Sequence, residues 1–293
     1  MTSFGAGGRR LLPAPGTPMI IAQITDFHVR PRGVMAYGGI DTNAMLRRAV
    51  AAIAALDPAP DCVLATGDLA DCGVPDEYRE IDAMLASLPM PTFVIPGNHD
   101  RRDVMRESLG DRHQYLRQHA DFLQYVIDDF PVRLIALDTV IGGETGGLVC
   151  AAREAWLAEA LARGNGKPTV VLMHHPPFRT GVPAMDPMMC RTSPTFAPLV
   201  SRHPEIERIV AGHYHRPIVA RFAGTIGFVA PSTAHQVALD LRDGEPTRWI
   251  LEPPGIALHA YRPASGIVSH VVPIGDFGPV HDFELPADYP GQA

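Results

Sequence analysis

The chain has 293 residues, of which 46% are hydrophobic and 19% charged, and this balance excludes a largely disordered protein. Its net charge of -7 argues against duplex nucleic acid as a partner, because Lys and Arg drive binding to phosphate backbones. No apolar run approaches the ~18 residues of a membrane helix, and the four cysteines form no C-x-x-C pair. We therefore expect a cytoplasmic protein that binds no membrane, with residues 1–18 as a disordered lead-in.

Strands and helices alternate along the first part of the chain. In chain order, hydrophobic patterning predicts a strand at 19–25, a helix at 41–56, a strand at 62–66, a helix at 75–88, a strand at 92–95, a mostly helical stretch over 103–125, a strand at 132–137, a helix at 151–162, and strands at 169–173 and 207–211. After residue 217 only short β-prone runs follow, at 227–230, 237–241, 256–261 and 267–272. This order favours an α/β fold with largely buried, mostly parallel strands.

Five of the predicted strands end in a short loop that carries metal-ligating residue types. These loops are Asp26-Phe27-His28, Gly67-Asp68, Gly97-Asn98-His99-Asp100, His174-His175 and Gly212-His213-Tyr214-His215. In open α/β sheets, ligands bind beyond the carboxyl ends of the strands, so we expect the five loops to converge on one place. A glycine before the ligand lets the backbone turn tightly and approach closely.

In this order, the five loops resemble the metallophosphoesterase (calcineurin-like phosphoesterase) superfamily, whose blocks run D-x-H, G-D, G-N-H-[DE], H and G-H-x-H. The resemblance implies an α/β fold built as a four-layer α/β/β/α sandwich of two mixed sheets flanked by helices. It also implies two divalent metal ions, of Mn, Fe, Zn or Co. One ion would be held by Asp26, His28, Asp68 and His215, and the other by Asp68, Asn98, His174 and His213, so that Asp68 bridges.

The charge of this ligand set fits the chemistry of phosphate esters. Two divalent ions bring four positive charges, and Asp26 and Asp68 are the two carboxylates among the ligands. About two positive charges remain, enough for a hydroxide and a phosphodiester monoanion. The excess also supplies the positive charge that an acidic chain lacks.

The resemblance assigns His99 to the substrate phosphate rather than to a metal ion. In the family, the His of G-N-H-[DE] stabilises the transition state or donates a proton to the leaving alkoxide. Asp100 would orient it. The alternative for His99 is a structural hydrogen bond.

A narrower resemblance concerns segments 37–43, 71–78, 185–187 and 234–237, which are similar to bacterial glycerophosphodiesterases and class III cyclic nucleotide phosphodiesterases. It implies that His235 lies near the metal site, and that Tyr37 and Asn43 lie near the substrate. It also implies a homo-oligomer.

We therefore expect a phosphodiesterase that hydrolyses small diesters, such as glycerophosphodiesters or 3′,5′-cyclic nucleotides, by attack of a metal-bound hydroxide. A phosphomonoesterase or nucleotide pyrophosphatase of the same superfamily is the alternative. A non-catalytic metal-binding scaffold is a third reading, against which the filled ligand positions argue. The catalytic domain is expected over 19–240, and a β-rich C-terminal extension, a candidate oligomer contact, over 241–293.

Overall fold

The computed structural model of the chain describes residues 17–283, so the expected lead-in lies almost wholly outside the described residues, as do residues 284–293. One sheet contains β1 (Met19–Ile24), β2 (Cys62–Thr66), β3 (Thr92–Ile95), β14 (Gly255–Arg262) and β15 (Gly266–Pro273). The other contains β4 (Tyr125–Ile127), β5 (Arg133–Ala136), β7 (Thr169–Leu172), β9 (Ile206–Ala211), β10 (Ile218–Phe222) and β11 (Thr225–Val229). Two short ribbons pair β6 (Gly147–Leu148) with β8 (Cys190–Arg191), and β12 (Gln236–Val237) with β13 (Trp249–Ile250).

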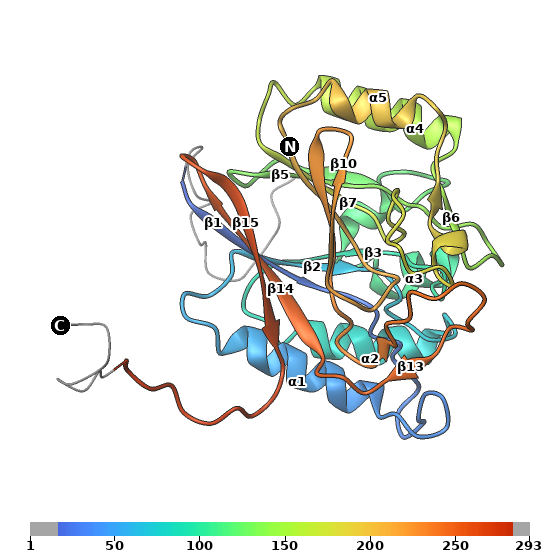
Figure 1. Cartoon of the computed structure of the whole chain (residues 1–293), viewed down its shortest axis with the longest axis vertical. Helices are drawn as coiled ribbons and strands as arrows, with labels where there is room; N and C mark the ends of the chain where they lie inside the picture. The colour runs from blue at the N-terminus through green and yellow to red at the C-terminus, as the bar shows by residue number, and fades with distance from the viewer. Residues whose placement is uncertain (1–16, 284–293) are drawn as a thin grey trace.

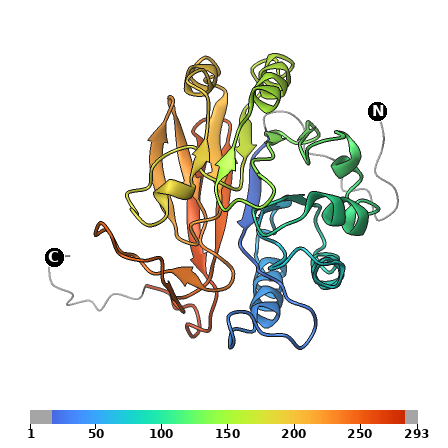
Figure 2. The same ribbon diagram turned by 90° about the vertical axis from the view of Figure 1, so that its right-hand side faces the viewer.

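The helices cover the outer faces of the two sheets (Figures 1 and 2). They are α1 (Thr42–Ala54), α2 (Pro75–Leu85), α3 (Arg102–Leu109), α4 (Ala151–Ala162) and α5 (Phe196–Ser201), with 3-10 helices η1 (Gln114–Arg117) and η2 (Asp186–Met188). In Figure 1, α4 and α5 lie on one side of the sheets, and α1 and α2 lie on the opposite side. Within residues 17–283, no helix is both long enough and apolar enough to cross a bilayer.

Alternating side chains on the strands build two separate cores. Leu134 and Ala136 of β5 belong to the large core that includes the side chains of α1, α2 and the first sheet. Ile135 of β5 and Leu137, which follows that strand, belong to the core beneath α4 and α5. Because successive strand residues point to opposite faces, each central strand of this sheet is buried on both sides. The layers are therefore helix, sheet, sheet and helix, as expected for an α/β/β/α sandwich.

The strand order places the predicted site at one edge of both sheets. The first sheet runs β15-β14-β1-β2-β3 and the second β10-β11-β9-β7-β5-β4. Strands β1, β2 and β3 are parallel, and so are β5, β7, β9 and β11, so their carboxyl ends share an edge within each sheet. The two sheets meet at that edge, where the Gln23 side chain donates to the Ala211 carbonyl at 2.9 Å.

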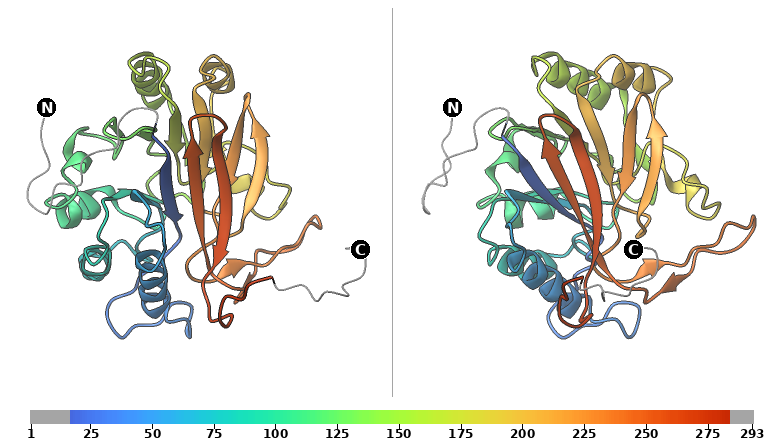
Figure 3. Two further views of the ribbon diagram at one scale, coloured as in Figure 1. Left: turned by 90° about the vertical axis from the view of Figure 1, so that its left-hand side faces the viewer. Right: turned by 60° about the vertical axis from the view of Figure 1, so that its left-hand side comes forward.

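The C-terminal hairpin β14–β15 completes the first sheet. β14 pairs antiparallel with β1 from Met19↔Tyr261 to Gln23↔Ala257, and Figure 3 shows the hairpin beside β1. These strands come from the segment that the sequence analysis assigned to a C-terminal extension. Region 103–125 is less helical than predicted, because α3 ends at Leu109, η1 is a single short turn, and β4 begins at Tyr125.

Candidate active site

The five predicted loops converge where the two sheets meet. The loops after β7 and β9 are joined by a hydrogen bond from the Gly212 N–H to the His174 carbonyl at 3.0 Å. The His213 N–H donates to both carboxylate oxygens of Asp26 at 3.0 Å, which ties β9 to β1. His174 Nδ1 lies 2.8 Å from the Thr66 carbonyl, which ties β7 to β2. Residues from both sheets therefore share one buried site.

The backbone of this site is strained. Left-handed φ angles occur at five candidate ligands: Asp26 (54°), His28 (47°), Asp68 (49°), His213 (71°) and His215 (49°). Among the other non-glycine residues that the structure describes, only Tyr37, Asn165 and Ala223 share this conformation. Such a residue costs on the order of 1–3 kcal/mol and persists only where its surroundings over-determine it, which is typical of functional sites.

Two glycines make the close approach of these loops possible. A Cβ at Gly97 would collide with the backbone and the carboxylate of Asp68. A Cβ at Gly212 would collide with the side chains of Thr25 and Asp26. In these two loops the glycine is thus required by packing with the neighbouring ligand loop.

Three imidazoles turn Nε2 into the site because Nδ1 is held from behind. Nδ1 of His28 lies 3.2 Å from Asp71 Oδ1, and Nδ1 of His215 lies 2.9 Å from the His235 carbonyl. Nδ1 of His174 faces the Thr66 carbonyl in the same way. Carbonyl and carboxylate oxygens only accept, so Nδ1 carries a proton and Nε2 is the nitrogen left to face the site, where a metal ion would displace any proton it holds.

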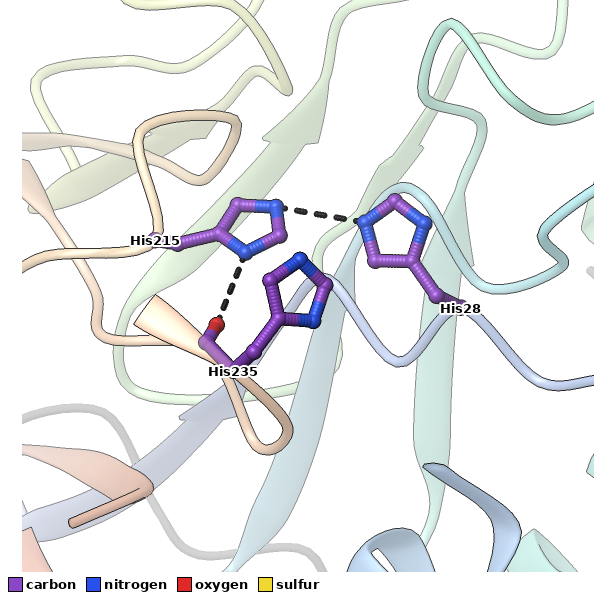
Figure 4. A group of neighbouring side chains, drawn as sticks. All are labelled: His28, His215 and His235. Carbon is purple, nitrogen blue, oxygen red and sulfur yellow. Dashed lines mark hydrogen bonds between the residues drawn. The ribbon is translucent and has the colours of Figure 1, made fainter. Parts of the chain in front are cut away.

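The first group of donor atoms comes from Asp26, His28, Asp68 and His215, all within 4.8 Å of one another. Nε2 of His28 and Nε2 of His215 face each other at 3.2 Å (Figure 4). Asp26 Oδ1 is 3.4 Å from the His215 nitrogen, and Asp68 Oδ2 is 3.8 Å from the His28 nitrogen. Two ring nitrogens this close to each other and to two carboxylates can bind one cation when both are deprotonated.

The second group lies on the other side of Asp68. His174 Nε2 is 3.3 Å from Asn98 Oδ1 and 3.3 Å from Asp68 Oδ2. Nε2 of His213 is buried without a hydrogen-bond partner among residues 17–283. His175 belongs to the same cluster, but both of its ring nitrogens are already hydrogen-bonded. Asp68 Oδ2 therefore faces both groups, as a bridging ligand would.

The two buried carboxylates of the site would be stabilised by added positive charge. Asp26 and Asp68 are buried, and within residues 17–283 their ion-pair partners are histidines only. Burial raises the pKa of Asp26 to about 6. Burial opposes ionisation of Asp68, but the neighbouring His174 outweighs it and holds the pKa of Asp68 well below its ordinary value. Burial alone would lower the pKa of His174, yet Asp68 raises it to about 9. Divalent cations fit this donor set, because they replace the histidine protons and satisfy the free nitrogens.

His99 lies beside this cluster and not within it. Its ring is 4.6 Å from the His28 ring, and Nδ1 faces the Asp71 carbonyl at 2.7 Å. Nε2 is thus the free end of the ring. About one third of the side chain is exposed, and it lines a cavity of about 760 Å³ together with Asn98 and Thr145. A substrate in this cavity would reach His99 directly.

Asp100 does not orient His99, contrary to the expectation from the sequence. Its carboxylate accepts hydrogen bonds from the backbone N–H groups of Leu69, Ala70 and Gly97, and from the Tyr78 hydroxyl. It thereby fastens the loop after β2 to the loop after β3. The carbonyl of Asp71, rather than the Asp100 carboxylate, holds the His99 ring.

The three remaining predicted residues lie at unequal distances from the centre. The His235 ring is 5.4 Å from His28 and 4.7 Å from His215 (Figure 4), and the Tyr37 ring is 6.3 Å from His28. The Asn43 amide, in contrast, is engaged by the backbone of Arg30, with both bonds at 2.9 Å. His235 and Tyr37 border the cluster, whereas Asn43 braces the loop behind it.

Asp71 is a residue that the sequence analysis did not single out for the site. Its Oδ1 receives the proton of His28 Nδ1, its carbonyl receives that of His99, and its Oδ2 is 3.0 Å from the Arg30 guanidinium. One residue therefore orients both a candidate ligand and the substrate-facing histidine. No local pattern marks Asp71 in the sequence, because its contacts with His28 and His99 span 43 and 28 residues.

A family model of calcineurin-like phosphoesterases matches residues 19–217. The chain belongs to this family. A protein of Arcobacter nitrofigilis named a probable glycerophosphodiester phosphodiesterase is 33% identical over 260 residues, 88% of this chain and 94% of that protein. A probable cyclic nucleotide phosphodiesterase of Rhodopseudomonas palustris is 33% identical over 250 residues, 84% of this chain and 89% of that protein.

The solved structure of a dimetal phosphatase from Danio rerio shares the fold, with a TM-score of 0.61 at 13% identity, covering 89% of this chain and all of that one. The comparisons confirm the expected superfamily and the expected four-layer fold. Calcineurin-like phosphoesterases use a pair of divalent metal ions, and this chain carries clustered histidines and aspartates suited to them.

Proposed function

We propose that the chain hydrolyses small phosphodiesters at a pair of divalent metal ions. The observation that carries the proposal is Asp68 Oδ2, which faces Nε2 of His28 on one side and Nε2 of His174 on the other. The first ion would be held by Asp26, His28, Asp68 and His215, and the second by Asp68, Asn98, His174 and His213. The relatives named as glycerophosphodiester and cyclic nucleotide phosphodiesterases support diesters as substrates.

When bound, two divalent ions lower the pKa of water toward neutrality and stabilise negative charge on the phosphoryl oxygens. The chain supplies the remaining parts. The cavity beside Asn98 and His99 receives the substrate. His99, with Nδ1 held by the Asp71 carbonyl, presents Nε2 to the phosphate or to the leaving oxygen. Because Nδ1 already carries a proton, donation from Nε2 requires that both ring nitrogens be protonated.

The choice of substrate is tested by a panel at equal metal loading. We expect bis(p-nitrophenyl) phosphate, glycerophosphoethanolamine or cyclic AMP to be hydrolysed faster than p-nitrophenyl phosphate, because a monoester dianion exceeds the charge that the site retains. A direct competition between glycerophosphoethanolamine and cyclic AMP, followed by product analysis, ranks the two diesters. Faster turnover of the monoester would contradict the proposal. The native metals, a homo-oligomeric state and a cytoplasmic location stay predictions.

Asp71 should govern metal affinity without touching the metal. Asp71→Ala removes the acceptor that fixes the proton of His28, and we expect affinity to fall about 10- to 100-fold, as for other partners of ligating histidines. Asp71→Asn keeps an acceptor oxygen for His28, so its metal affinity should fall less than that of Asp71→Ala. Metal content under a graded chelator measures both variants, and Asp76→Ala, an exposed residue of α2, is the matched control. Unchanged metal retention in Asp71→Ala would rule out the role.

A further inference from the structure

Three aromatic rings stand in a row on one flank of the metal cluster. The Tyr37 ring is 4.9 Å from the His235 ring, and the His235 ring is 6.2 Å from the Trp249 ring, both edge to face. His235 is buried, but Tyr37 and Trp249 are 52% and 48% exposed. We call these three residues the aromatic wall. Large rings half open to solvent beside a catalytic centre offer free π faces.

The Tyr37 end of the wall is held in a costly conformation. Tyr37 has a φ of 48°, which is unusual for a bulky residue, and Gly38 follows with a φ of 75°. The turn is closed by reciprocal hydrogen bonds between the backbones of Ala36 and Ile40 at 2.9 Å. Its base is fixed to the site, because the Thr42 hydroxyl donates to the His28 carbonyl at 2.7 Å. Observed strain of this kind points to a functional demand on the side chain.

The Trp249 end is equally well supported. Trp249 pairs with Val237 in the β12–β13 ribbon. Val237 lies two residues after His235 in the chain, so this pairing brings Trp249 close to His235. The Arg216 guanidinium binds the Val237 carbonyl at 2.7 Å and the Glu252 carboxylate at 2.6 Å, which fastens both strands of the ribbon to the body. Figure 3 shows the chain between these strands projecting from the body. Trp249 pairs with Val237, whose carbonyl Arg216 binds. The ring is therefore preorganised.

The wall and the cavity both border His28 of the cluster. His28 contacts His99, which lines the cavity, and it also contacts Tyr37 and His235 of the wall. A phosphodiester has two arms on one phosphorus atom. With phosphorus at the cluster, an acyclic diester can place one arm in the cavity and the other against the wall. In a 3′,5′-cyclic nucleotide both ester oxygens belong to one ribose, so only its base is left to lie against the wall. Nδ1 of His235, buried and without a partner among residues 17–283, adds a polar contact on this flank.

We propose that the aromatic wall receives a planar aromatic arm of the diester, so that Tyr37 and Trp249 make the site selective for diesters that carry a nucleobase or an aryl group. This inference rests on the proposed phosphodiesterase function. Every base and aryl group has a π face that stacks on an aromatic side chain, whereas a glycerol arm has none. The selectivity is therefore a matter of ring stacking and not of hydrogen-bond pattern.

Kinetics give the first test. In the metal-loaded enzyme, Trp249→Leu should raise KM about tenfold for cyclic AMP and for bis(p-nitrophenyl) phosphate, and leave glycerophosphoethanolamine unchanged. Trp249→Phe should restore most of the loss, because it keeps a π face. Ile250→Ala, on the opposite face of the same ribbon, is the matched control. A loss confined to cyclic AMP assigns a nucleobase, and a loss shared with the aryl ester assigns aromatic rings in general.

A second readout does not depend on turnover. The chain has two tryptophans, so Trp156→Phe leaves Trp249 as the only tryptophan, which can be excited selectively at wavelengths where the tyrosines do not absorb. AMP should quench its emission in the metal-loaded protein, whereas glycerol 3-phosphate should not. Equal quenching by both ligands, equal kinetic loss on all diesters, or no loss at all would overturn the inference. So would dissociation of an oligomer by Trp249→Leu with unchanged selectivity, since the wall would then be a subunit interface. If the parent enzyme hydrolyses no diester, the proposed function fails. The AMP titration still tests whether the aromatic wall binds a nucleobase, because it does not depend on turnover.

Discussion

Removal of the metal ions is expected to abolish hydrolysis of bis(p-nitrophenyl) phosphate completely, and Mn²⁺ or Co²⁺ should restore it. The reason lies in the charge of the site: Asp26 and Asp68 are buried, and their described ion-pair partners are histidines. Without cations nothing at the cluster stabilises a second negative charge on phosphorus. Chelation, dialysis and re-addition of metal, with elemental analysis at each step, measure the effect.

The same experiment has a structural readout. Ions that bind only the folded chain raise its unfolding temperature, so the metal-free protein should melt earlier than the loaded protein. Asp68→Ala, which removes the residue shared by both donor groups, should behave like the metal-free parent at every metal concentration. Full turnover after exhaustive chelation would refute the proposed chemistry, and two metal equivalents per chain are expected in the restored enzyme.

Replacement of His99 should give the next largest loss. We expect His99→Gln to lower kcat about 10²- to 10⁴-fold, the range of general acid–base contributions, while metal content stays constant. The loss should be larger for glycerophosphoethanolamine than for bis(p-nitrophenyl) phosphate, because nitrophenolate leaves without help from a proton. The His99 side chain lines the cavity and is not among the proposed ligands. Because it also lies within 4.8 Å of ligand atoms of His28 and Asp71, constant metal content in His99→Gln is the observation that excludes it as a ligand.

The control for this variant is His119→Gln. His119 lies between η1 and β4, where its Nδ1 accepts hydrogen bonds from the local backbone at Asp121 and Phe122. It should retain full activity and full metal content. If His99→Gln lost metal in proportion to activity, His99 would be a structural residue and not a group that acts on the substrate. An equal loss with both leaving groups at constant metal content would assign His99 to the phosphate and contradict proton donation to the leaving oxygen.

The sequence was most informative where a strand is buried on both faces. β2 and β3 begin and end at the predicted residues. All their residues are buried, so each strand coincides with a continuous run in the sequence that is mostly apolar. β10 was missed for the opposite reason. Every second residue of this edge strand is exposed, and its apolar run is only three residues long before Arg221 interrupts it. Its partner β11 begins after a turn at Ala223 and Gly224, both with positive φ, and the composition of that turn gave no signal at Ala223.

At the site, the residue types could be predicted from the sequence, but the contacts between distant residues could not. Loops at strand ends could be recognised because ligating residue types recur there in a fixed order. The roles of Asp71 and Asp100 could not, since neither a hydrogen bond from His28 to a carboxylate nor a carboxylate that collects three backbone N–H groups leaves a local pattern. The position of Trp249 beside the site could not be predicted either. Only the pairing of β12 with β13 brings it close to His235, and the sequence gives no sign of that pairing.

The return of the C-terminal hairpin to β1 has a consequence for synthesis. β1 emerges from the ribosome early, but its neighbour β14 emerges more than two hundred residues later, as the contact between Gln23 and His259 illustrates with a separation of 236 residues. Domains tend to fold as units during translation, and distant pairings form slowly. The loop that bears Asp26 and His28 therefore lacks the support of β14 until that distant strand has been synthesised, so this side of the metal cluster cannot be completed while β1 and β2 alone are available.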